Sequence, residues 1–283
     1  MPPGCPACGE TAARRLYTKN GCDILRCDSC GLGRTETAGF DPQTYYTSGY
    51  FCGQHADGYR DYLGEEPVLR RQFARTVDFL RGFVAGGRLL EIGCAYGFFL
   101  QEAKRYFSVS GIEMAEDAAA HARQGGLDVI HGAAGEKTLA PLGPMDAIVL
   151  LDVIEHLPDP CGTLALCERF LKPGGVIVLT TGDFNSLYAR IAGANWRLMT
   201  PPQHLWFFTP ASISHLAARL GLAVEVSDRP WKIVPLSLIL FQLRRMLGLA
   251  AVTPPAAAAG SSRIGVPVNL FDAMRVVLRK PKR

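Results

Sequence analysis

The sequence 89-LLEIGCAYGFFL-100 decides the fold of this chain. An apolar run ends in a loop that contains Gly93 and Gly97, and a second apolar run with helical composition follows. In α/β proteins, a buried strand, a glycine turn and a helix in this order place a nucleotide-like ligand at the carboxyl end of the strand. A dinucleotide site needs two close glycines to admit a pyrophosphate, and here three residues separate them. Glu91 would also repel a phosphate, so the loop suits a small ligand with a cationic end.

Predicted strands and helices alternate around this stretch, as they do in the βαβ units of a parallel sheet. The expected strands cover residues 88–92, 109–113, 127–131, 145–151, 176–181 and 222–226. The expected helices cover residues 68–83, 98–106, 115–123, 160–171 and 211–220. A seventh strand, residues 273–278, is expected at the edge of the sheet. The sequence thus predicts an α/β fold around a mostly parallel sheet.

The composition is that of an ordinary globular protein with enough chain for a large core. Of the 283 residues, 48% are hydrophobic and 20% are charged, and the formal net charge is +4. Five basic residues, with no acid among them, lie between Arg275 and Arg283 at the C-terminus. Without these five, the rest of the chain carries a charge of −1. A surface that binds nucleic acid would be more basic, so we expect no nucleic-acid partner.

The apolar segment 233–252 is the one stretch long enough to consider as a membrane span. Pro235 near its start and Arg244-Arg245 within it argue against a spanning helix. Its helical stripe of leucine and isoleucine is expected to pack in a core or a dimer, with a lid over a lipid-linked acceptor as the alternative, which would allow contact with a membrane surface. The N-terminus has no secretion signal, so we expect a cytoplasmic protein, and the sequence does not specify its oligomeric state.

Four cysteines near the N-terminus have the spacing of a zinc site. Cys5 and Cys8 form one C-x-x-C pair, Cys27 and Cys30 form another, and glycine follows each pair. The 18 residues between the pairs fall within the range of four-cysteine zinc sites. Two thiolates on each tight turn reach one tetrahedral ion, and four sulfur ligands leave no position for a substrate. We therefore expect a structural zinc ion in a small ribbon, residues 1–39.

Free thiols spaced by chance, or a redox pair, are the alternative interpretation of these cysteines. The acids and bases of the ribbon nearly balance, whereas a ribbon that binds nucleic acid would be basic. The five remaining cysteines have no paired spacing and are expected to be small packing residues; they are Cys22, Cys52, Cys94, Cys161 and Cys167. A reducing, cytoplasmic setting agrees with this use of cysteine.

Acidic residues follow two predicted strands at the edge of the sheet where the glycine loop lies. Glu113 comes twenty residues after Gly93, the offset at which an acid meets the ribose hydroxyls of an adenosine-bearing ligand. After the fourth strand, the segment L-D-V-I-E-H-L-P-D-P projects Asp152, Glu155 and His156 over the same crevice. Ligands of open α/β sheets bind in this crevice, so these side chains are candidates for contact with a ligand.

Together these features resemble a class I S-adenosylmethionine-dependent methyltransferase. The resemblance rests on E-x-G-x-x-x-G beginning at Glu91, an acid at the end of the second strand, and D-V-I-E-H-L before 171-LKPGG-175. It covers residues 89–181 closely and the chain to its end more loosely. It implies a Rossmann-like, seven-stranded α/β sheet with S-adenosylmethionine as the cofactor. The residues agree with it, because this cofactor has a sulfonium and an amino-acid end but no phosphate.

The resemblance also implies cofactor roles for individual residues. In the glycine loop these are Glu91, Gly93, Cys94 and Gly97, while Glu113 is expected at the ribose, Met114 at the adenine, and Leu151 and Asp152 at the floor of the site. The sequence departs from the family pattern at one place. Ala133 and Ala134 stand where many relatives have an acid near the adenine amino group.

The resemblance divides the chain into three parts. The zinc ribbon covers residues 1–39, an aromatic linker and helical cap cover 40–87, and the methyltransferase domain covers 88–283. Two acceptor-binding insertions are expected within that domain, at 182–210 and 229–265. The tyrosines of the linker either cover a substrate or pack the ribbon on the domain.

The first insertion has aromatic and polar side chains that suit a carbohydrate or a ring. His204 lies beside Trp206, Phe207 and Phe208 and is a candidate base for the removal of a hydroxyl proton. His156 is the second candidate for the base. Either histidine has the alternative role of anchoring its loop through a hydrogen bond.

We therefore expect S-adenosylmethionine-dependent O-methylation of a small-molecule or sugar-like hydroxyl acceptor. The four-cysteine ribbon resembles that of bacterial methyltransferases that modify sugars. One alternative is a ribosomal RNA base methyltransferase, against which the nearly neutral ribbon and the absence of an N/D-P-P-Y-type segment argue. The other is a zinc-ribbon binding module with a non-catalytic methyltransferase fold, which failure to bind S-adenosylmethionine would favour.

Overall fold

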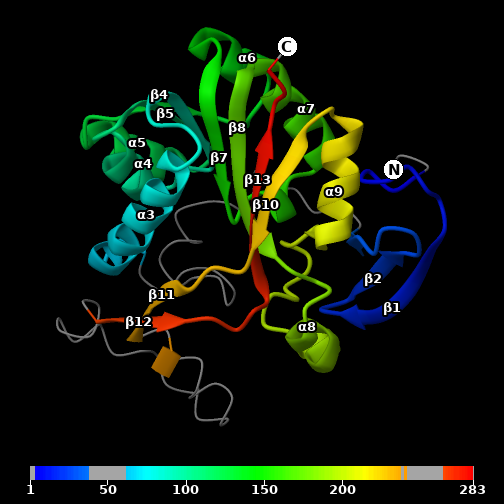
Figure 1. Cartoon of the computed structure of the whole chain (residues 1–283). Helices are drawn as coiled ribbons and strands as arrows, with labels where there is room; N and C mark the ends of the chain where they lie inside the picture. The colour runs from blue at the N-terminus through cyan, green and yellow to red at the C-terminus, as the bar shows by residue number, and fades with distance from the viewer. Residues whose placement is uncertain (1–3, 38–61, 237–238, 241–263, 283) are drawn as a thin grey trace.

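The computed structural model describes residues 4–37, 62–236, 239–240 and 264–282. The strands of its central sheet are β4 (Gly87–Ile92), β5 (Phe107–Glu113), β6 (Asp128–His131), β7 (Met145–Leu151), β8 (Leu171–Gly182), β10 (Ala223–Asp228) and β13 (Ala273–Arg279). They lie side by side in the order β10-β13-β8-β7-β4-β5-β6 (Figure 1). The strands from β4 to β8 pair in parallel. The predicted seven-stranded α/β sheet is confirmed.

The prediction for the last strand is wrong. The sequence places residues 273–278 at the sheet edge, but β13 lies between β8 and β10 and runs antiparallel to both. Val276, Val277 and Leu278 are fully buried, as expected for a strand with neighbours on both sides and helices on both faces. The edge strand is β10, whose side chains are mostly exposed.

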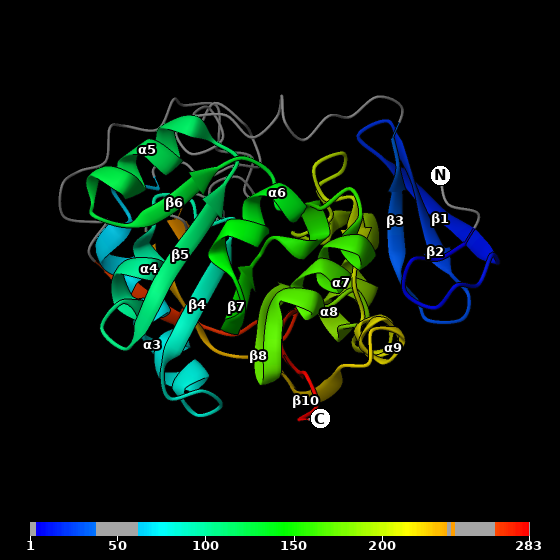
Figure 2. The same cartoon turned by 90° about the horizontal axis from the view of Figure 1, so that it is seen from above.

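Helices cover both faces of the sheet (Figure 2). The helices on one face are α3 (Glu66–Arg81), α4 (Phe98–Ala103) and α5 (Glu116–Gln124), and those on the other are α7 (Pro160–Phe170) and α9 (Pro210–Arg219). Successive side chains of a strand point to opposite faces, so Leu89 of β4 packs in the first layer and Leu90 in the second. These helices match their predicted ranges to within three residues at each end.

The N-terminal ribbon is a three-stranded antiparallel sheet to which the main domain adds a fourth strand. The ribbon strands are β1 (Ala13–Lys19), β2 (Cys22–Cys27) and β3 (Gly33–Glu36). The fourth strand, β9 (Trp206–Phe207), comes from the first predicted insertion and pairs with β3. Beside it, buried ribbon cysteines share a hydrophobic core with α9. The ribbon is therefore packed on the main domain.

The remaining elements are short. They are α6 (Glu136–Leu139), α8 (Leu187–Ala192), the 3₁₀ helices η1 (Ala140–Leu142), η2 (Ile154–His156) and η3 (Gly193–Asn195), and a hairpin of β11 (Lys232–Pro235) and β12 (Gly265–Val268). The tyrosine-rich linker from 40 to 61, the segment 253–262, and residues 237–238 and 241–247 around the predicted stripe lie outside the described residues. No helix of the described part of the chain is long and apolar enough to cross a membrane.

Candidate cofactor and acceptor site

Close packing fixes the loop between β4 and α4 at its two glycines. Gly93 and Gly97 have φ angles of 73° and 82°, which glycine adopts without steric penalty. A Cβ atom on Gly93 would lie 2.6 Å from Val153 Cγ2, and one on Gly97 would lie 2.4 Å from Leu127 Cδ1. The neighbouring chain leaves no room for a side chain at either position. The backbone of the loop is therefore presented at the carboxyl end of β4.

Glu91 is a buried acid with an unsatisfied oxygen. Its side chain is buried, and among the described residues no group hydrogen-bonds its Oε2 atom. Burial, followed by repulsion from Glu113, raises the pKa of Glu91 well above its ordinary value. Buried polar atoms without a partner are rare in proteins, so we expect a group of a bound ligand to contact this oxygen. A cationic group beside Glu91 would stabilise the ionised carboxylate.

Glu113 ends β5 and holds the glycine loop. Its carboxylate accepts hydrogen bonds from the backbone N–H groups of Ala95 and Ala115, each 2.8 Å long. Burial raises the pKa of Glu113, and these two N–H groups oppose the rise. The carboxylate oxygens have further lone pairs, so they remain able to accept hydrogen bonds from ribose hydroxyls. The sequence did not predict these hydrogen bonds. Through the bond from Ala95, Glu113 stabilises the glycine loop.

The other predicted cofactor residues lie around this turn. Cys94 is buried, and burial raises the pKa of its thiol. The carbonyl of Met114 accepts a hydrogen bond of 3.0 Å from His131 Nε2. Leu151 ends β7, and Asp152 follows it with a φ of 55°. The fold thus brings the predicted cofactor residues together at the carboxyl ends of β4, β5 and β7.

Asp152 is paired with a lysine from the second predicted insertion. Lys232 Nζ lies 3.0 and 3.2 Å from the two carboxylate oxygens of Asp152, and Thr180 Oγ1 donates to Oδ1 at 2.8 Å. Desolvation raises the pKa of Asp152, but Lys232, Thr180 and Arg197 together outweigh it and the pKa is lowered. Lys232 carries no motif and is 80 residues away in the sequence, so sequence reasoning missed it. The pair ties β11 to the end of β7.

The fold brings the two predicted histidines together. The rings of His156 and His204 lie 4.6 Å apart between centroids, in an edge-to-face arrangement. His204 Nδ1 donates to the Leu198 carbonyl at 2.8 Å, and His156 Nδ1 donates to the Gln203 carbonyl at 3.1 Å. Because a carbonyl only accepts, Nδ1 carries a proton in both rings. Burial lowers the pKa of His204 to about 3, so His204 is neutral at pH 7.

Glu155 is the third titratable group of this cluster. Its side chain is 4% exposed, and no hydrogen-bond partner for its Oε2 is present in the part of the chain that the structure describes. Burial, followed by the charge of Asp152, raises the pKa of Glu155 to about 8. One ligand atom from each of Glu155, His156 and His204 lies within 4.8 Å of the others. In the sequence, the E-H pair that follows the fourth predicted strand indicates this acid as a candidate site residue.

Unsatisfied polar atoms concentrate in this region of the molecule. In the described ranges, four buried side-chain oxygens have no hydrogen-bond partner; they are Glu91 Oε2, Glu155 Oε2, Thr200 Oγ1 and Gln203 Oε1. One belongs to the end of β4, just before the glycine loop, and the other three to η2 and the segment before β9. Because native proteins leave few such atoms unpaired, this distribution favours ligand binding at the carboxyl end of β4 and near η2.

The four ribbon cysteines form a compact cluster. The Sγ atoms of Cys5 and Cys30 lie 3.5 Å apart and those of Cys8 and Cys27 lie 3.6 Å apart, with all four within 4.8 Å of one another. A disulfide would bring two sulfurs to about 2.05 Å, which excludes that bond here. Around zinc at about 2.3 Å, tetrahedral sulfurs are separated by about 3.8 Å. The cluster therefore fits a tetrahedral metal ion.

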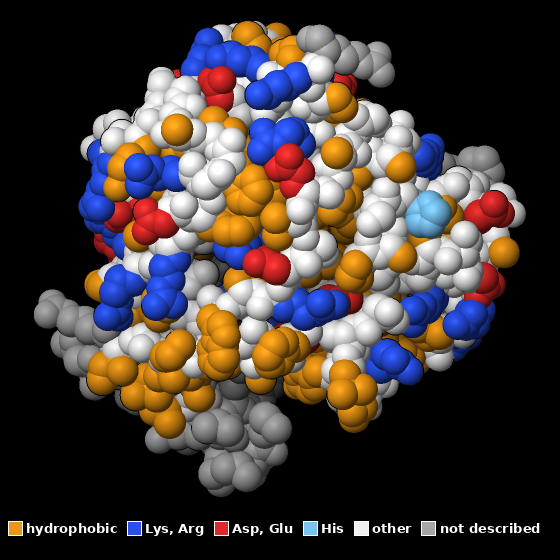
Figure 3. Space-filling model, in the orientation of Figure 1, with side chains coloured by type: hydrophobic (Ala, Val, Ile, Leu, Met, Phe, Trp, Pro, Cys, Tyr) orange, Lys and Arg blue, Asp and Glu red, His pale blue; other side chains and the backbone are white. Residues whose placement is uncertain are grey.

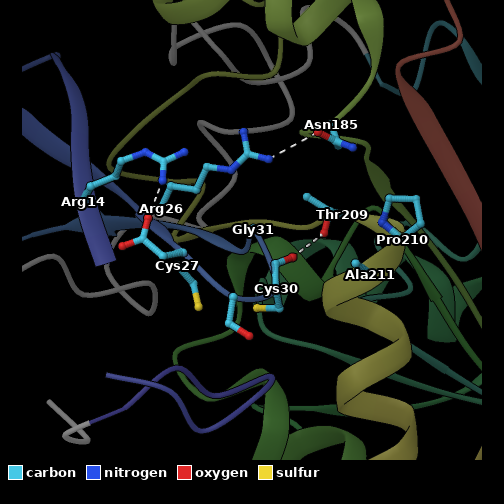
Figure 4. A pocket seen from close by; sticks show the side chains of 11 residues that line it. Arg14, Arg26, Cys27, Cys30, Gly31, Asn185, Thr209, Pro210 and Ala211 are labelled. Carbon is cyan, nitrogen blue, oxygen red and sulfur yellow. Dashed lines mark hydrogen bonds and ion pairs between the residues drawn. The ribbon is translucent and has the colours of Figure 1, made fainter. Parts of the chain in front are cut away.

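The protein has two further surface features. A cavity of about 420 Å³ lies between the second cysteine pair and the start of α9, where Arg26 Nη2 donates to Asn185 Oδ1 at 3.2 Å (Figure 4). It shares no lining residue with the glycine loop or the histidine pair. Hydrophobic side chains also gather along the edge of the molecule formed by α8 and the β11–β12 hairpin (Figure 3). Leu187 and Ile191 on α8 are 71% and 77% exposed.

The fold and the glycine loop define the class of the protein. Four features fit a cofactor that has an adenosine and a cationic end but no phosphate. They are the sheet order, the antiparallel β13, the unpartnered Oε2 atom of Glu91 and the acid at the end of β5. The protein is a class I S-adenosylmethionine-dependent methyltransferase.

Comparison with known proteins gives the same result. Residues 66–226, more than half of the chain, match the family model of the methyltransferase domain. The chain belongs to this methyltransferase family. It is an enzyme, as the sequence predicts, and its cofactor is S-adenosylmethionine.

Curated relatives and solved structures cover more than half of the chain. The ubiquinone biosynthesis O-methyltransferase of Methylococcus capsulatus is 29% identical over 185 residues, which are 60% of this chain and 78% of the relative. That of Cereibacter sphaeroides is 33% identical over 57% of this chain and 69% of the relative. In fold, the chain resembles the magnesium protoporphyrin IX methyltransferase of Synechocystis, with S-adenosylhomocysteine bound, at a TM-score of 0.53 and 13% identity. That match covers 84% of this chain and 97% of the other.

We predict that Glu113→Ala weakens S-adenosylmethionine binding at least tenfold. The substitution removes the acceptors for the ribose hydroxyls and releases the loop amides of Ala95 and Ala115, and the loss of hydrogen bonds to a charged group amounts to more than about 1.4 kcal/mol. Titration calorimetry measures the affinity. Glu116→Ala, in the exposed first turn of α5, is the control and should bind as the wild type does. Unchanged affinity in Glu113→Ala would contradict the ribose assignment.

Proposed function

We propose that this protein transfers the methyl group of S-adenosylmethionine to a hydroxyl oxygen of a small-molecule or sugar-like acceptor. The observation that carries the proposal is the cluster of Glu155, His156 and His204, which places groups able to accept a proton beside unsatisfied polar atoms. The curated relatives are O-methyltransferases, which favours oxygen as the methylated atom over the alternative of a ribosomal RNA base.

In this proposal the glycine loop holds the cofactor. Glu91 faces its cationic amino-acid end, Glu113 accepts the ribose hydroxyls, and the loop amides near Cys94 and Gly97 bind its carboxylate. Met114 lies on the adenine side, and Leu151 and Asp152 form the floor of the site. The bound cofactor supplies an electrophilic methyl group on its sulfonium. The protein has to align the acceptor oxygen with that methyl group and remove a proton.

We assign the proton transfer to the histidine pair. His204 is neutral and exposes the lone pair of Nε2, so it accepts the hydroxyl proton as the oxygen attacks the methyl group. Its low pKa makes the protonated ring unstable unless a negative charge is near. Glu155 lies within 4.8 Å and supplies that charge once its carboxyl group is ionised. His156 is the second candidate for the base, because its Nδ1 also donates to a carbonyl and its ring lies against that of His204.

The acceptor binds, in this proposal, beside the junction of η2 and the segment before β9. Thr200 and Gln203 present unpartnered oxygens there, which suit hydrogen-bond donors such as acceptor hydroxyls. The exposed apolar side chains on α8 and beside the hairpin, including Trp231 and Phe271, favour an acceptor that also has an apolar part.

We further propose that the ribbon cysteines bind one zinc ion. Cys5, Cys8, Cys27 and Cys30 fill a tetrahedral coordination sphere, so the ion has no open position and takes no part in the chemistry. Its role is to hold the two cysteine turns of the ribbon together.

An acceptor screen with methyl-labelled S-adenosylmethionine tests the proposed function. The panel contains a catechol, a nucleotide sugar and a short ribosomal RNA duplex, and label in the acceptor is measured with and without the protein. We expect label on a hydroxyl of the catechol or the sugar. Label on the RNA base would overturn the assignment of the acceptor. Binding of S-adenosylmethionine without turnover on a broad hydroxyl panel would favour the non-catalytic module.

We predict that kcat rises with pH through about pH 8. Because the folded-state pKa of Glu155 is raised to about 8, its carboxylate is mostly protonated at pH 6.5 and ionised at pH 9. Asp152 opposes this ionisation and Lys232 favours it. The ionised carboxylate stabilises the protonated His204, so kcat should rise roughly tenfold over this range. Glu155→Gln should remove the step; a step of equal size in that variant would assign the titration to another group.

A further inference from the structure

The ribbon is hydrogen-bonded directly to the chain segment that carries His204. Thr35, in β3, donates its hydroxyl to the carbonyl of His204 at 2.6 Å, and its N–H donates to the carbonyl of Leu205 at 2.9 Å. Thr35 is 6% exposed, so little water competes for these bonds. One buried ribbon residue thus fixes the backbone on both sides of the peptide bond that follows His204.

The ribbon also holds this segment at both of its ends. Asn20 Nδ2 donates to the carbonyl of Pro201 at 2.8 Å. At the other end, Thr209 Oγ1 donates to the carbonyl of Cys30 at 3.0 Å (Figure 4). Between these points, β9 is paired with β3. The segment 201–209 is therefore attached to the ribbon along its length.

The opposite side of the segment is attached to the loop after β7. The Leu205 N–H donates to the carbonyl of Glu155 at 2.9 Å, and Trp206 Nε1 donates to the carbonyl of Leu157 at 2.8 Å. Hydrogen bonds thus hold the segment on two sides, to the ribbon and to the turn that carries Glu155 and His156. The His204–His156 contact lies at this junction, so its geometry depends on both attachments.

We propose that the ribbon is a positioning element for methyl transfer and that Thr35 is the positioning residue that orients His204 from outside the site. The inference rests on the proposed role of His204 as the base. A displacement of about 1 Å at a catalytic group can lower the rate about a hundredfold. A segment held on one side only has the freedom for such a displacement. Thr35 bonds to the His204 segment and not to the glycine loop, so its effect falls on kcat and not on cofactor affinity.

Thr35→Val tests the proposal, because valine keeps the shape of threonine and removes the hydroxyl donor. We expect kcat to fall about tenfold to a hundredfold, with the acceptor KM and the affinity for S-adenosylmethionine within about twofold of wild type. Thr35→Ser restores the hydroxyl and should recover most of the rate. Thr18→Val is the matched control, since Thr18 bonds within the ribbon to Asp23 and should leave kcat unchanged. Wild-type kcat in Thr35→Val, with zinc content unchanged, would overturn the proposal.

A double-mutant cycle separates this inference from the proposed function. If Thr35 acts through His204, then Thr35→Val has no further effect on kcat in a His204→Ala background. Equal losses in both backgrounds would show that Thr35 acts by another route. Full turnover in His204→Ala would instead refute the proposed base.

Hydrogen exchange gives a readout that needs no acceptor. In Thr35→Val, the amides of segment 201–209 should exchange faster, while those of the glycine loop keep wild-type protection. If Thr35→Val loses zinc or unfolds, Asn20→Gly loosens the same segment instead, because glycine accepts the φ of 50° at this position. Unchanged exchange in the segment in a folded variant would contradict the positioning role.

Discussion

Replacing His204 with alanine is expected to lower kcat for methyl transfer by roughly 10²–10⁴, the range for loss of a general base. The cofactor supplies the electrophile, so the protein's part in the chemical step is alignment and the late removal of a proton. His204 presents a neutral Nε2 lone pair next to Glu155, and no cofactor-loop residue bonds to its ring in the described contacts. Affinity for S-adenosylmethionine should therefore remain within about twofold of wild type. Single-turnover methylation and titration calorimetry measure the two quantities.

The control for this substitution is His215→Ala, on the exposed face of α9, which should have wild-type kcat. His156→Ala is expected to affect both rate and cofactor binding, because η2 follows directly on Asp152 at the floor of the site. A His204→Ala enzyme with wild-type turnover would leave His204 as an anchor of its loop through Leu198. The base would then be His156 or solvent.

Replacing Cys27 with serine is expected to abolish zinc binding, from one ion per chain to less than about 0.1 by elemental analysis. Serine removes one of four thiolates from a cluster whose sulfurs are already placed for tetrahedral coordination. Structural zinc sites contribute apparent free energies of about 10–16 kcal/mol, so the loss should unfold the ribbon. Because the ribbon clamps the segment that carries His204, kcat should fall together with the zinc content.

The control for this substitution is Cys22→Ser. Cys22 lies on β2 of the same ribbon, outside the four-cysteine cluster, and its thiol donates to the carbonyl of Asn20. This variant should keep one zinc ion per chain and wild-type kcat. A Cys27→Ser protein that retains its zinc would reject the proposed site. A freshly purified wild-type protein without zinc would reject it as well.

The local patterns of the sequence were sufficient to predict most of the secondary structure. Strand β8 shows the limit of this information, because it begins at Leu171, five residues before the predicted start. Taken alone, the sequence K-P-G-G predicts a turn. In the folded protein, the pairing of Leu171 with Met145 of β7, with a register shift after it, extends the strand through these residues.

The sequence also predicted that the residues of the proposed cofactor site meet at one edge of the sheet. Gly93, Gly97 and Glu113 lie at the ends of two consecutive strands, and parallel strands bring these ends to one edge of the sheet. The acceptor side was predictable only as a set of candidates. His156 and His204 are 48 positions apart in the sequence, and no pattern specifies that their rings meet.

The sequence by itself determined the glycine loop, the order of strands and helices along the chain, and the two cysteine turns. These features depend on backbone conformation and on residues close in sequence, whose spacing carries the information. Only the tertiary structure decided that β13 inserts between β8 and β10, that Lys232 pairs with Asp152, and that β9 joins the ribbon sheet and places His204 between Thr35 and Glu155. These are long-range pairings, and their energies come from burial and hydrogen bonds between segments that become neighbours only when the whole chain is packed.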